Sequence, residues 1–265
     1  MKDFYLFVFL TSCIAAGGYL LNDLVDIKGD QYNQKRSFIN QGWEKRAALL
    51  AYGVITICPI PFAFSLASEI GHPEYFWYYV IVVGLLIIYN VLLKRIALMG
   101  NIVVATLCAG VLWMFMHGEQ ESLSKLYEVN YVSYMKVQMM AIFYYVFAFI
   151  SNLSREIVKD VQDMPGDTLI GAKTLPIVVG VKVTRWTVFM LSSILLAFSI
   201  YWLIHYTVQW VLFLSFILLV IAPNIYMIWI FSRSIPIVMY QNISNHFKLW
   251  MITGIIFIFI ASFNF

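Results

Sequence analysis

Eight long stretches of apolar residues constrain this chain more than any other feature. Each is long enough to cross a hydrocarbon core about 30 Å thick, which takes about 20 helical residues. Hydrophobic residues make up 62% of the chain and charged residues only 12%, which excludes an ordinary soluble domain. The stretches cover residues 4–21, 47–68, 75–93, 99–116, 134–151, 186–204, 208–231 and 249–265.

These stretches predict helices rather than strands. Their apolar residues run continuously, without the period of two that is typical of strands in a membrane barrel. A helix also satisfies its backbone hydrogen bonds within itself, as lipid requires. We therefore predict an all-α, polytopic membrane bundle of eight transmembrane helices.

The basic residues predict the orientation of the bundle. Fourteen of the seventeen Lys and Arg residues fall in the loops after the first, third, fifth and seventh predicted helices. Cytoplasmic loops carry an excess of Lys and Arg, so we expect these loops in the cytoplasm. We expect an integral protein of a bacterial inner membrane with its site on the cytoplasmic side. No basic run with a nucleic-acid motif appears, so no nucleic-acid partner is expected.

Two acidic segments repeat one pattern. The sequence NDLVDIKGD at residues 22–30 and the sequence KDVQDMPGD at residues 159–167 carry Asp, Asp, Gly and Asp in the same register. Each segment ends an apolar stretch and is followed by a long basic loop and three more apolar stretches. We predict a single membrane domain over residues 1–265, built from two pseudo-repeats at about 1–133 and 134–265.

The spacing of the acidic residues places them on one helix face. Residues at i, i+3 and i+7 fall within an arc of roughly 60° on an α-helix. Gly29 in the first motif and Pro165 with Gly166 in the second weaken a helix just before its last Asp. We therefore expect the last Asp of each motif to hang from an unwound end. The residues of the two faces are Asp23, Asp26 and Asp30, with Asn22 at the edge, and Asp160, Asp163 and Asp167.

This donor set predicts a divalent metal site. Oxygen ligands without His or Cys favour Mg²⁺ or Mn²⁺ over zinc, and Mg²⁺ completes its coordination with water and substrate phosphates. Surrounding cations supply the rest of an anion site. The predicted substrate is a diphosphate ester whose hydrocarbon tail lies in the membrane. The cations are Lys35, Arg36, Lys94, Arg155, Lys159 and Lys173.

A simpler explanation is that the Asp residues form a solvated cap that balances the basic loops. A short motif found once would leave the two explanations about equal, because such motifs often match by accident. Two copies in register at equivalent helix ends favour a functional site.

At this point the residues resemble the UbiA superfamily of intramembrane prenyltransferases, over nearly the whole chain. The first motif matches the family pattern NDxxDxxxD, and Asp163 with Asp167 matches its second pattern, DxxxD. The sequence YNVLLK at residues 89–94, followed by Asn101, is similar to the family's YxxxxK element. The sequences SREIVKDVQDMPGD and GAKTLPI also fit the family.

The resemblance implies a fold of nine helices around a central cavity with a cytoplasmic cap, one helix more than the sequence predicts here. It also implies two Mg²⁺ ions that hold a polyprenyl diphosphate. The implied metal ligands are Asn22, Asp23, Asp26, Asp30, Asp163 and Asp167, and the repeat adds Asp160. The implied diphosphate contacts are Lys94, Asn101, Arg155 and Lys173, with Lys159 beside them. The residues expected to be catalytic are Asp23, Asp26, Asp163 and Lys94.

One segment departs from the family pattern. Many members that use aromatic acceptors carry an Arg-Pro-rich segment after the first motif. The corresponding segment here is QYNQKRSFINQGWEKR, which has no proline. Arg36 is the residue that would stand in for the family's arginine.

The resemblance leaves the acceptor and the oligomeric state open. The second motif with GAKTLPI is most similar to the branch that alkylates geranylgeranylglyceryl phosphate. Transfer to 4-hydroxybenzoate or a quinone precursor, and an inactive lipid-binding homologue, are the alternatives. A cation-coupled transporter fits less well, because its acidic site should lie near the membrane midplane. A CDP-alcohol phosphotransferase would need DG and AR residues that the motifs lack.

Overall fold

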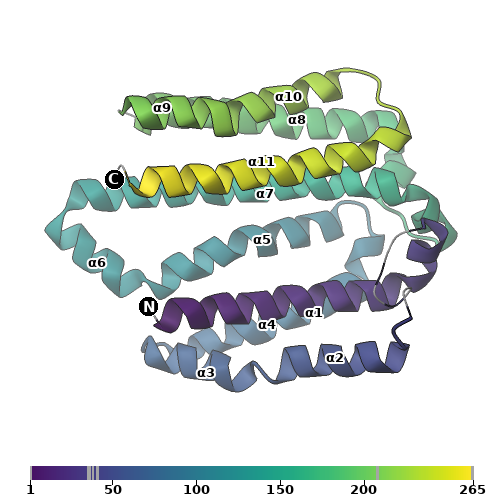
Figure 1. Ribbon diagram of the computed structural model, residues 1–265, viewed down its shortest axis with the longest axis horizontal. Helices are drawn as coiled ribbons and strands as arrows, with labels where there is room; N and C mark the ends of the chain where they lie inside the picture. The colour runs from purple at the N-terminus through teal and green to yellow at the C-terminus, as the bar shows by residue number, and fades with distance from the viewer. Residues whose placement is uncertain (1, 35–36, 38, 40–41, 207–208, 264–265) are drawn as a thin grey trace. The chain divides into compact units, whose positions relative to one another are not determined.

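The computed structural model describes residues 2–34, 37, 39, 42–206 and 209–263. Those residues are almost wholly helical, and their one isolated bridge pairs Ile96 with Lys173 (Figure 1). Short 3-10 turns lie at Pro73–Tyr75, Leu93–Arg95 and Ile237–Met239, and a π-helical segment lies at Ile217–Ile221. The α-helices are α1 (Lys2–Tyr32), α2 (Lys45–Ile57), α3 (Ile60–Glu69), α4 (Phe76–Val91), α5 (Met99–Gly118), α6 (Gln120–Val129), α7 (Tyr131–Leu169), α8 (Leu175–Tyr206), α9 (Trp210–Phe216), α10 (Ala222–Ser232) and α11 (Tyr240–Ser262).

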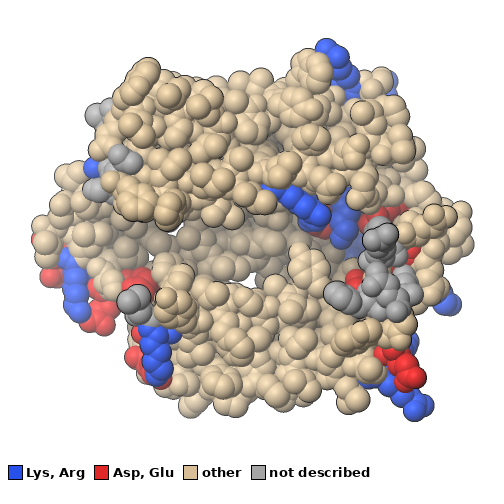
Figure 2. All heavy atoms as spheres, viewed as in Figure 1, with Lys and Arg blue, Asp and Glu red and all other residues tan. Residues whose placement is uncertain are grey.

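Eight helical spans are long and apolar enough to cross a membrane, which confirms the predicted eight-helix bundle. Two of them are interrupted helices, because α2 with α3 forms one span and α9 with α10 forms another. On the face that Figure 2 shows, charged side chains gather toward the ends of the helices and uncharged side chains cover their middle stretches. The protein is therefore an integral membrane protein.

The described chain divides into two compact units. Unit 1 comprises residues 1–103 and 163–174, and unit 2 comprises residues 104–162 and 175–265. The helices α5 and α7 each begin in one unit and end in the other. These boundaries differ from those of the two pseudo-repeats. The pseudo-repeats were inferred from the sequence pattern alone, and they stay a prediction.

Unit 1 packs α1 against α2 and α4. Its core contains Leu10, Ala63 and Tyr79. Pro59 separates α2 from α3, as expected for a residue that cannot donate a helical hydrogen bond. The hydroxyl of Tyr79 donates to the carbonyl of Thr56 in the last turn of α2, at 2.9 Å. A neighbouring helix thus supplies a donor at the break, as lipid-embedded backbone requires.

A cluster of aromatic rings forms the core of unit 2. Phe143 on α7 is fully buried and lies 5.0 Å from Trp202 and 5.1 Å from Phe216, measured between ring centroids. Phe257 on α11 completes the cluster, 5.0 Å from Phe216. Aromatic pairs contribute about 0.5–1.5 kcal/mol beyond the area they bury. The cluster therefore holds α7, α8, α9 and α11 together.

A second proline break in unit 2 is also satisfied by a neighbouring helix. Pro223 cannot donate to the carbonyl of Leu219, and the preceding turn is π-helical. The hydroxyl of Thr253 on α11 donates to that carbonyl at 2.7 Å. The indole of Trp250 donates to the carbonyl of Val220 at 3.0 Å. The chain before Pro223 therefore forms a π-helical turn whose carbonyls accept hydrogen bonds from side chains of α11.

The helices α7 and α11 lie side by side in unit 2 and approach closely at Gly254 (Figure 1). A Cβ atom there would lie 2.8 Å from the ring of Phe147, which is itself packed against Trp250. The same approach lets the hydroxyl of Tyr144 donate to the carbonyl of Gly254 at 2.6 Å. This buried hydrogen bond ties the two helices together.

We predict that Tyr144→Phe lowers the free energy of unfolding by about 0.5–1.5 kcal/mol, because it removes the donor from a buried interhelical hydrogen bond. Titration of the protein in mixed micelles with a denaturing detergent would measure the change. Tyr145→Phe is the matched control, since Tyr145 is the next residue and is exposed. Equal stability of the two variants would contradict a stabilising role for the Tyr144 contact.

Candidate functional site

The first acidic motif lies within α1, which continues through Gly29 to Tyr32. The amide of Asn33 donates to the carbonyl of Gly29 at 2.9 Å, so helical hydrogen bonding persists past Asp30. The expectation that Asp30 hangs from an unwound end is therefore wrong. Asp30 is a buried residue of the last helical turns.

Ser37, which follows α1 in the sequence, contacts this motif. The hydroxyl of Ser37 donates to Asp23 Oδ2 at 3.0 Å, and the amide of Ile39 donates to the Ser37 hydroxyl at 3.2 Å. Ser37 is buried. Lys35 and Arg36, two of the predicted anion-binding cations, lie outside the described residues.

The second motif is also helical, because α7 includes Pro165 and runs to Leu169. The expectation of an unwound end is thus wrong for Asp167 as well. The helix ends in a Schellman motif, in which the amide of Ala172 donates to the carbonyl of Asp167 at 2.9 Å and that of Gly171 to Thr168 at 3.2 Å. Gly171 has a φ of 71°, a conformation that favours glycine. This explains the glycine of GAKTLPI.

The ends of α1 and α7 touch within unit 1. The Asn33 side chain accepts from the amide of Gly166 at 3.0 Å and donates to the carbonyl of Asp163 at 3.3 Å. A Cβ atom on Gly166 would lie 2.8 Å from the carbonyl oxygen of Gly29. Glycine at this position therefore permits backbone contact between the two motifs. Asp163 and Asp167 belong to the same compact unit as the whole first motif.

Lys94 joins this group from the turn between α4 and α5. Its Nζ lies 2.7 Å from Asp26 Oδ1, and the two side chains are 10% and 22% exposed. Gly100 lets the start of α5 pack on the same turn, since a Cβ there would lie 2.7 Å from the Lys94 Cα. Asn101 follows in the first turn of α5 and is buried.

The segment after the second motif reaches the same turn. The amide of Lys173 donates to the carbonyl of Arg95 at 2.8 Å, which fixes the backbone of Lys173 next to the Lys94 turn, although its side chain is exposed. The structure describes twelve of the predicted site residues. Unit 1 contains nine of these twelve, namely Asn22, Asp23, Asp26, Asp30, Lys94, Asn101, Asp163, Asp167 and Lys173.

The other three predicted site residues, Arg155, Lys159 and Asp160, lie in unit 2 on the preceding turns of α7. Here the structure adds a residue that the sequence analysis missed. Glu156 is buried, and its carboxylate lies 2.5 Å from Arg155 Nη1 and 3.9 Å from Lys159 Nζ. Its spacing of four and seven residues before Asp160 and Asp163 is the signal that could have found it.

The acidic residues offer only oxygen donors, which fits Mg²⁺ by chemistry. Within the described part of the chain, no three His, Cys, Asp or Glu side chains lie together as a preformed metal cage. Mg²⁺ usually binds one or two carboxylates and takes its other ligands from water and phosphates. Separate carboxylates on two touching helix ends therefore suit Mg²⁺ delivered with a phosphorylated ligand.

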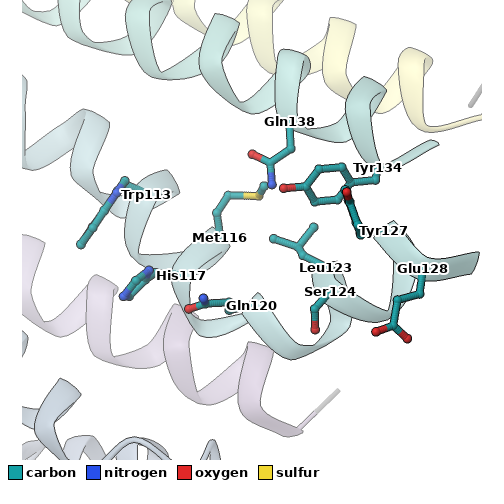
Figure 3. Close-up of a pocket in the computed structure, with 10 residues that line it drawn as sticks. All are labelled: Trp113, Met116, His117, Gln120, Leu123, Ser124, Tyr127, Glu128, Tyr134 and Gln138. Carbon is teal, nitrogen blue, oxygen red and sulfur yellow. The ribbon is translucent and has the colours of Figure 1, made fainter. Parts of the chain in front are cut away.

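A pocket of about 490 Å³ lies elsewhere in unit 2 (Figure 3). Residues from the end of α5, from α6 and from the start of α7 line it, among them Trp113, His117, Tyr127 and Gln138. None of the predicted site residues lines this pocket, and its α7 residues lie near the opposite end of that helix from Asp163. The pocket is therefore separate from the second acidic motif, which lies at the other end of α7.

We predict that Gly166→Ala lowers the free energy of unfolding by about 1–3 kcal/mol, the usual cost of overpacking. The new methyl group would lie 2.4 Å from Asn33 Nδ2, beside backbone that cannot retreat. Gly29→Ala is the matched control at the same register of the first motif, where the methyl group would meet nothing closer than 3.9 Å. Detergent unfolding would test this, and similar losses in both variants would contradict the proposed contact.

Comparisons with known proteins agree with the motifs. The digeranylgeranylglyceryl phosphate synthase of Methanoculleus marisnigri is 30% identical over 208 residues, which are 74% of this chain and 66% of that protein. The synthase of Sulfolobus acidocaldarius is 32% identical over 191 residues, which are 68% of this chain and 59% of that protein. The synthase of Pyrococcus furiosus is 30% identical over 167 residues, which are 63% of this chain and 53% of that protein. The chain thus spans about half to two thirds of these relatives.

A solved structure described as giving insight into digeranylgeranylglyceryl phosphate synthase in membranes has the same fold. The TM-score is 0.65, with 18% sequence identity, and the match covers 100% of this chain and 87% of the other. The model of the UbiA prenyltransferase family matches residues 2–252. The resemblance read from the motifs is therefore confirmed, and the chain belongs to the UbiA prenyltransferase family.

Proposed function

We propose that this protein is a Mg²⁺-dependent prenyltransferase of the membrane. It would transfer a prenyl group from a polyprenyl diphosphate to a membrane-associated acceptor, with geranylgeranylglyceryl phosphate as the favoured acceptor. Family membership and relatives named digeranylgeranylglyceryl phosphate synthase support this reaction class.

The observation that carries the proposal is the contact between the two acidic motifs in unit 1. Asn33 joins the helix end that bears Asp26 to the one that bears Asp163, and Lys94 contacts Asp26. Carboxylates of two helix ends and a lysine thus belong to one compact unit. This combination suits a diphosphate and its divalent counterions.

In this proposal the acidic residues hold the metal and the basic residues hold the phosphates. The proposed metal ligands are Asn22, Asp23, Asp26, Asp30, Asp160, Asp163 and Asp167, and the proposed diphosphate contacts are Lys94, Asn101, Arg155, Lys159 and Lys173. UbiA prenyltransferases are generally Mg²⁺-dependent, and we propose two ions. When bound, Mg²⁺ supplies positive charge that stabilises the departing diphosphate.

The proposed reaction exchanges one C–O bond for another. The bond between the allylic carbon and the diphosphate oxygen breaks, and its electron pair leaves with the diphosphate. The acceptor hydroxyl oxygen forms an ether bond to that carbon and releases its proton. Lys94 contributes a fixed ammonium group at the site where negative charge grows on the leaving group, which lowers the barrier most when the group is preorganised.

The acceptor is the least constrained part of the proposal. The names of the relatives favour a glycerophosphate lipid, whereas the family also leaves an aromatic acceptor open. Purified protein would be incubated with labelled geranylgeranyl diphosphate, Mg²⁺ and either geranylgeranylglyceryl phosphate or 4-hydroxybenzoate. A labelled ether lipid is the expected product. Labelled aromatic product alone would shift the proposal to the other acceptor class.

We propose that the site faces the cytoplasm, from the basic loops on that side of the predicted bundle. The relatives named above are archaeal, so they lend no support to the expected bacterial inner membrane.

We predict that Lys94→Met lowers the rate of prenyl transfer at least about 100-fold, because it removes a preorganised charge at the leaving group. Asp26→Asn should cause a similar loss. Arg95→Met is the matched control in the same turn, where the exposed side chain is replaced and the backbone carbonyl bonded to Lys173 is kept. The measurement is product formation under saturating substrate. Wild-type rates for Lys94→Met would remove this residue from the proposed site.

We predict that chelation of divalent cations with EDTA abolishes pyrophosphate release, and that added Mg²⁺ or Mn²⁺ restores it. Oxygen-only donors bind both ions, whereas the carboxylates alone cannot neutralise a diphosphate. Pyrophosphate release assayed after chelation and after each addition would test this. Full activity after exhaustive chelation would rule out the metal.

A further inference from the structure

Glu156 has a place in the structure that the proposed chemistry does not explain. It lies on α7, it is only 8% exposed, and it interacts with two cations. Its carboxylate contacts Arg155 at 2.5 Å and Lys159 at 3.9 Å. A buried carboxylate next to two predicted anion-binding cations is unfavourable for anion binding, because it cancels one unit of the positive charge that the anion needs. Its presence therefore calls for a physical reason.

The register of α7 places Glu156 on the same helix face as the second acidic motif. Residues at i, i+4, i+7 and i+11 fall within an arc of about 60° on an α-helix. Those positions are Glu156, Asp160, Asp163 and Asp167, and α7 is continuous across all of them. Lys159 lies at the edge of this face. Glu156 is thus the residue of the face farthest from the helix end.

The first acidic motif has no equivalent group. When the two motifs are aligned, Glu156 corresponds to Tyr19, which is 73% exposed, and Arg155 corresponds to Gly18. Lys159 corresponds to Asn22. Two cations and the carboxylate between them therefore occur together, and only in the second motif.

We propose that Glu156 is a positioning residue, which holds Arg155 and Lys159 in the orientation that the diphosphate requires. This inference rests on the proposed prenyl transfer. Glu156 would touch neither the substrate nor a metal ion, and its effect would pass through the two cations.

The physical reason is preorganisation. Arg and Lys side chains are long and have many rotamers, so fixing them only when the diphosphate binds costs conformational entropy. A buried carboxylate that holds the Arg155 guanidinium fixes it before binding. Arg155 Nε is buried and has no hydrogen-bond partner in the described part of the chain, so the guanidinium keeps a donor for an anion. Glu156 thus cancels one unit of positive charge, but it holds the guanidinium in a fixed orientation.

Two other roles for Glu156 make different predictions. If Glu156 were a metal ligand, its replacement would raise the Mg²⁺ concentration needed for the half-maximal rate. If Glu156 were purely structural, its replacement would lower the unfolding midpoint and the amount of folded protein, with no selective effect on the chemical step. If Glu156 is a positioning residue, Glu156→Gln should lower kcat. KM for the prenyl diphosphate should stay equal or fall, because the variant has one negative charge fewer beside the two cations.

The central experiment compares Glu156→Gln with wild-type protein in Mg²⁺-dependent transfer of geranylgeranyl groups. We expect kcat to fall at least about tenfold, since small misplacement of charged groups is costly, with no rise in KM. The Mg²⁺ dependence and the unfolding midpoint should not change. Glu156→Asp should recover part of kcat, because it keeps the charge. Glu121→Gln is the control, since Glu121 is an exposed carboxylate on α6.

A combined variant tests whether the effect passes through the two cations. In a background with Arg155→Met and Lys159→Met, Glu156→Gln should lower kcat no further. Additive losses would overturn the positioning role. Unchanged kcat in Glu156→Gln would also overturn it, and so would a loss that is matched by a shift in Mg²⁺ dependence or by unfolding.

The failure of this inference can be told apart from the failure of the proposed function. Geranylgeranyl thiodiphosphate, an unreactive analogue, would be titrated into wild-type protein with Mg²⁺ and binding followed by calorimetry. If wild-type protein neither binds the analogue nor transfers prenyl groups, the proposed function fails and the role of Glu156 is overturned with it. If wild-type protein does both and Glu156→Gln behaves identically, only the role of Glu156 fails.

Discussion

The contact between the ends of α1 and α7 is the constraint on which the candidate site depends. Acidic residues on two neighbouring helix ends repel each other, so other interactions must hold the two ends together. Asn33 provides that link through two hydrogen bonds to the second motif, and Gly166 leaves room for it. Without this contact, the ion pair of Asp26 with Lys94 would not be joined to the second motif through Asn33. Because of this contact, carboxylates separated by more than a hundred residues in the sequence belong to one compact unit.

Much of this arrangement could be predicted from sequence, because it follows from periodicity and composition. Eight apolar spans, the breaks at Pro59 and Pro223, and the identity of the motif residues all follow from local rules. The conformation of Asp30 and Asp167 could not be predicted that way. Gly29 and Pro165 locally disfavour a helix, but tertiary contacts such as that of Asn33, together with the Schellman motif at Gly171, accompany a helix that continues through both motifs. Glu156 was missed although its spacing matches the second motif, because its contacts with Arg155 and Lys159 depend on side-chain packing.

The two motifs, although similar in sequence, differ in what surrounds them. The first receives its lysine from a distant turn, since Lys94 reaches Asp26 from the connection between α4 and α5. The second has cations on its own helix, held by Glu156. A repeated motif therefore defines a shared set of carboxylates, whereas the neutralising charge comes from different elements on each side.

The side chains that satisfy the proline breaks also have a consequence for biogenesis. Tyr79, Trp250 and Thr253 all belong to helices that are synthesised after the helix they complete. A ribosome therefore delivers α2 and the π-helical turn before α10 to the membrane while their interhelical donors are still missing. Carbonyl groups left in lipid without donors are costly. The hydrogen bonding of each broken span is thus completed only when a later helix arrives, which couples the order of synthesis to the stability of the partly assembled bundle.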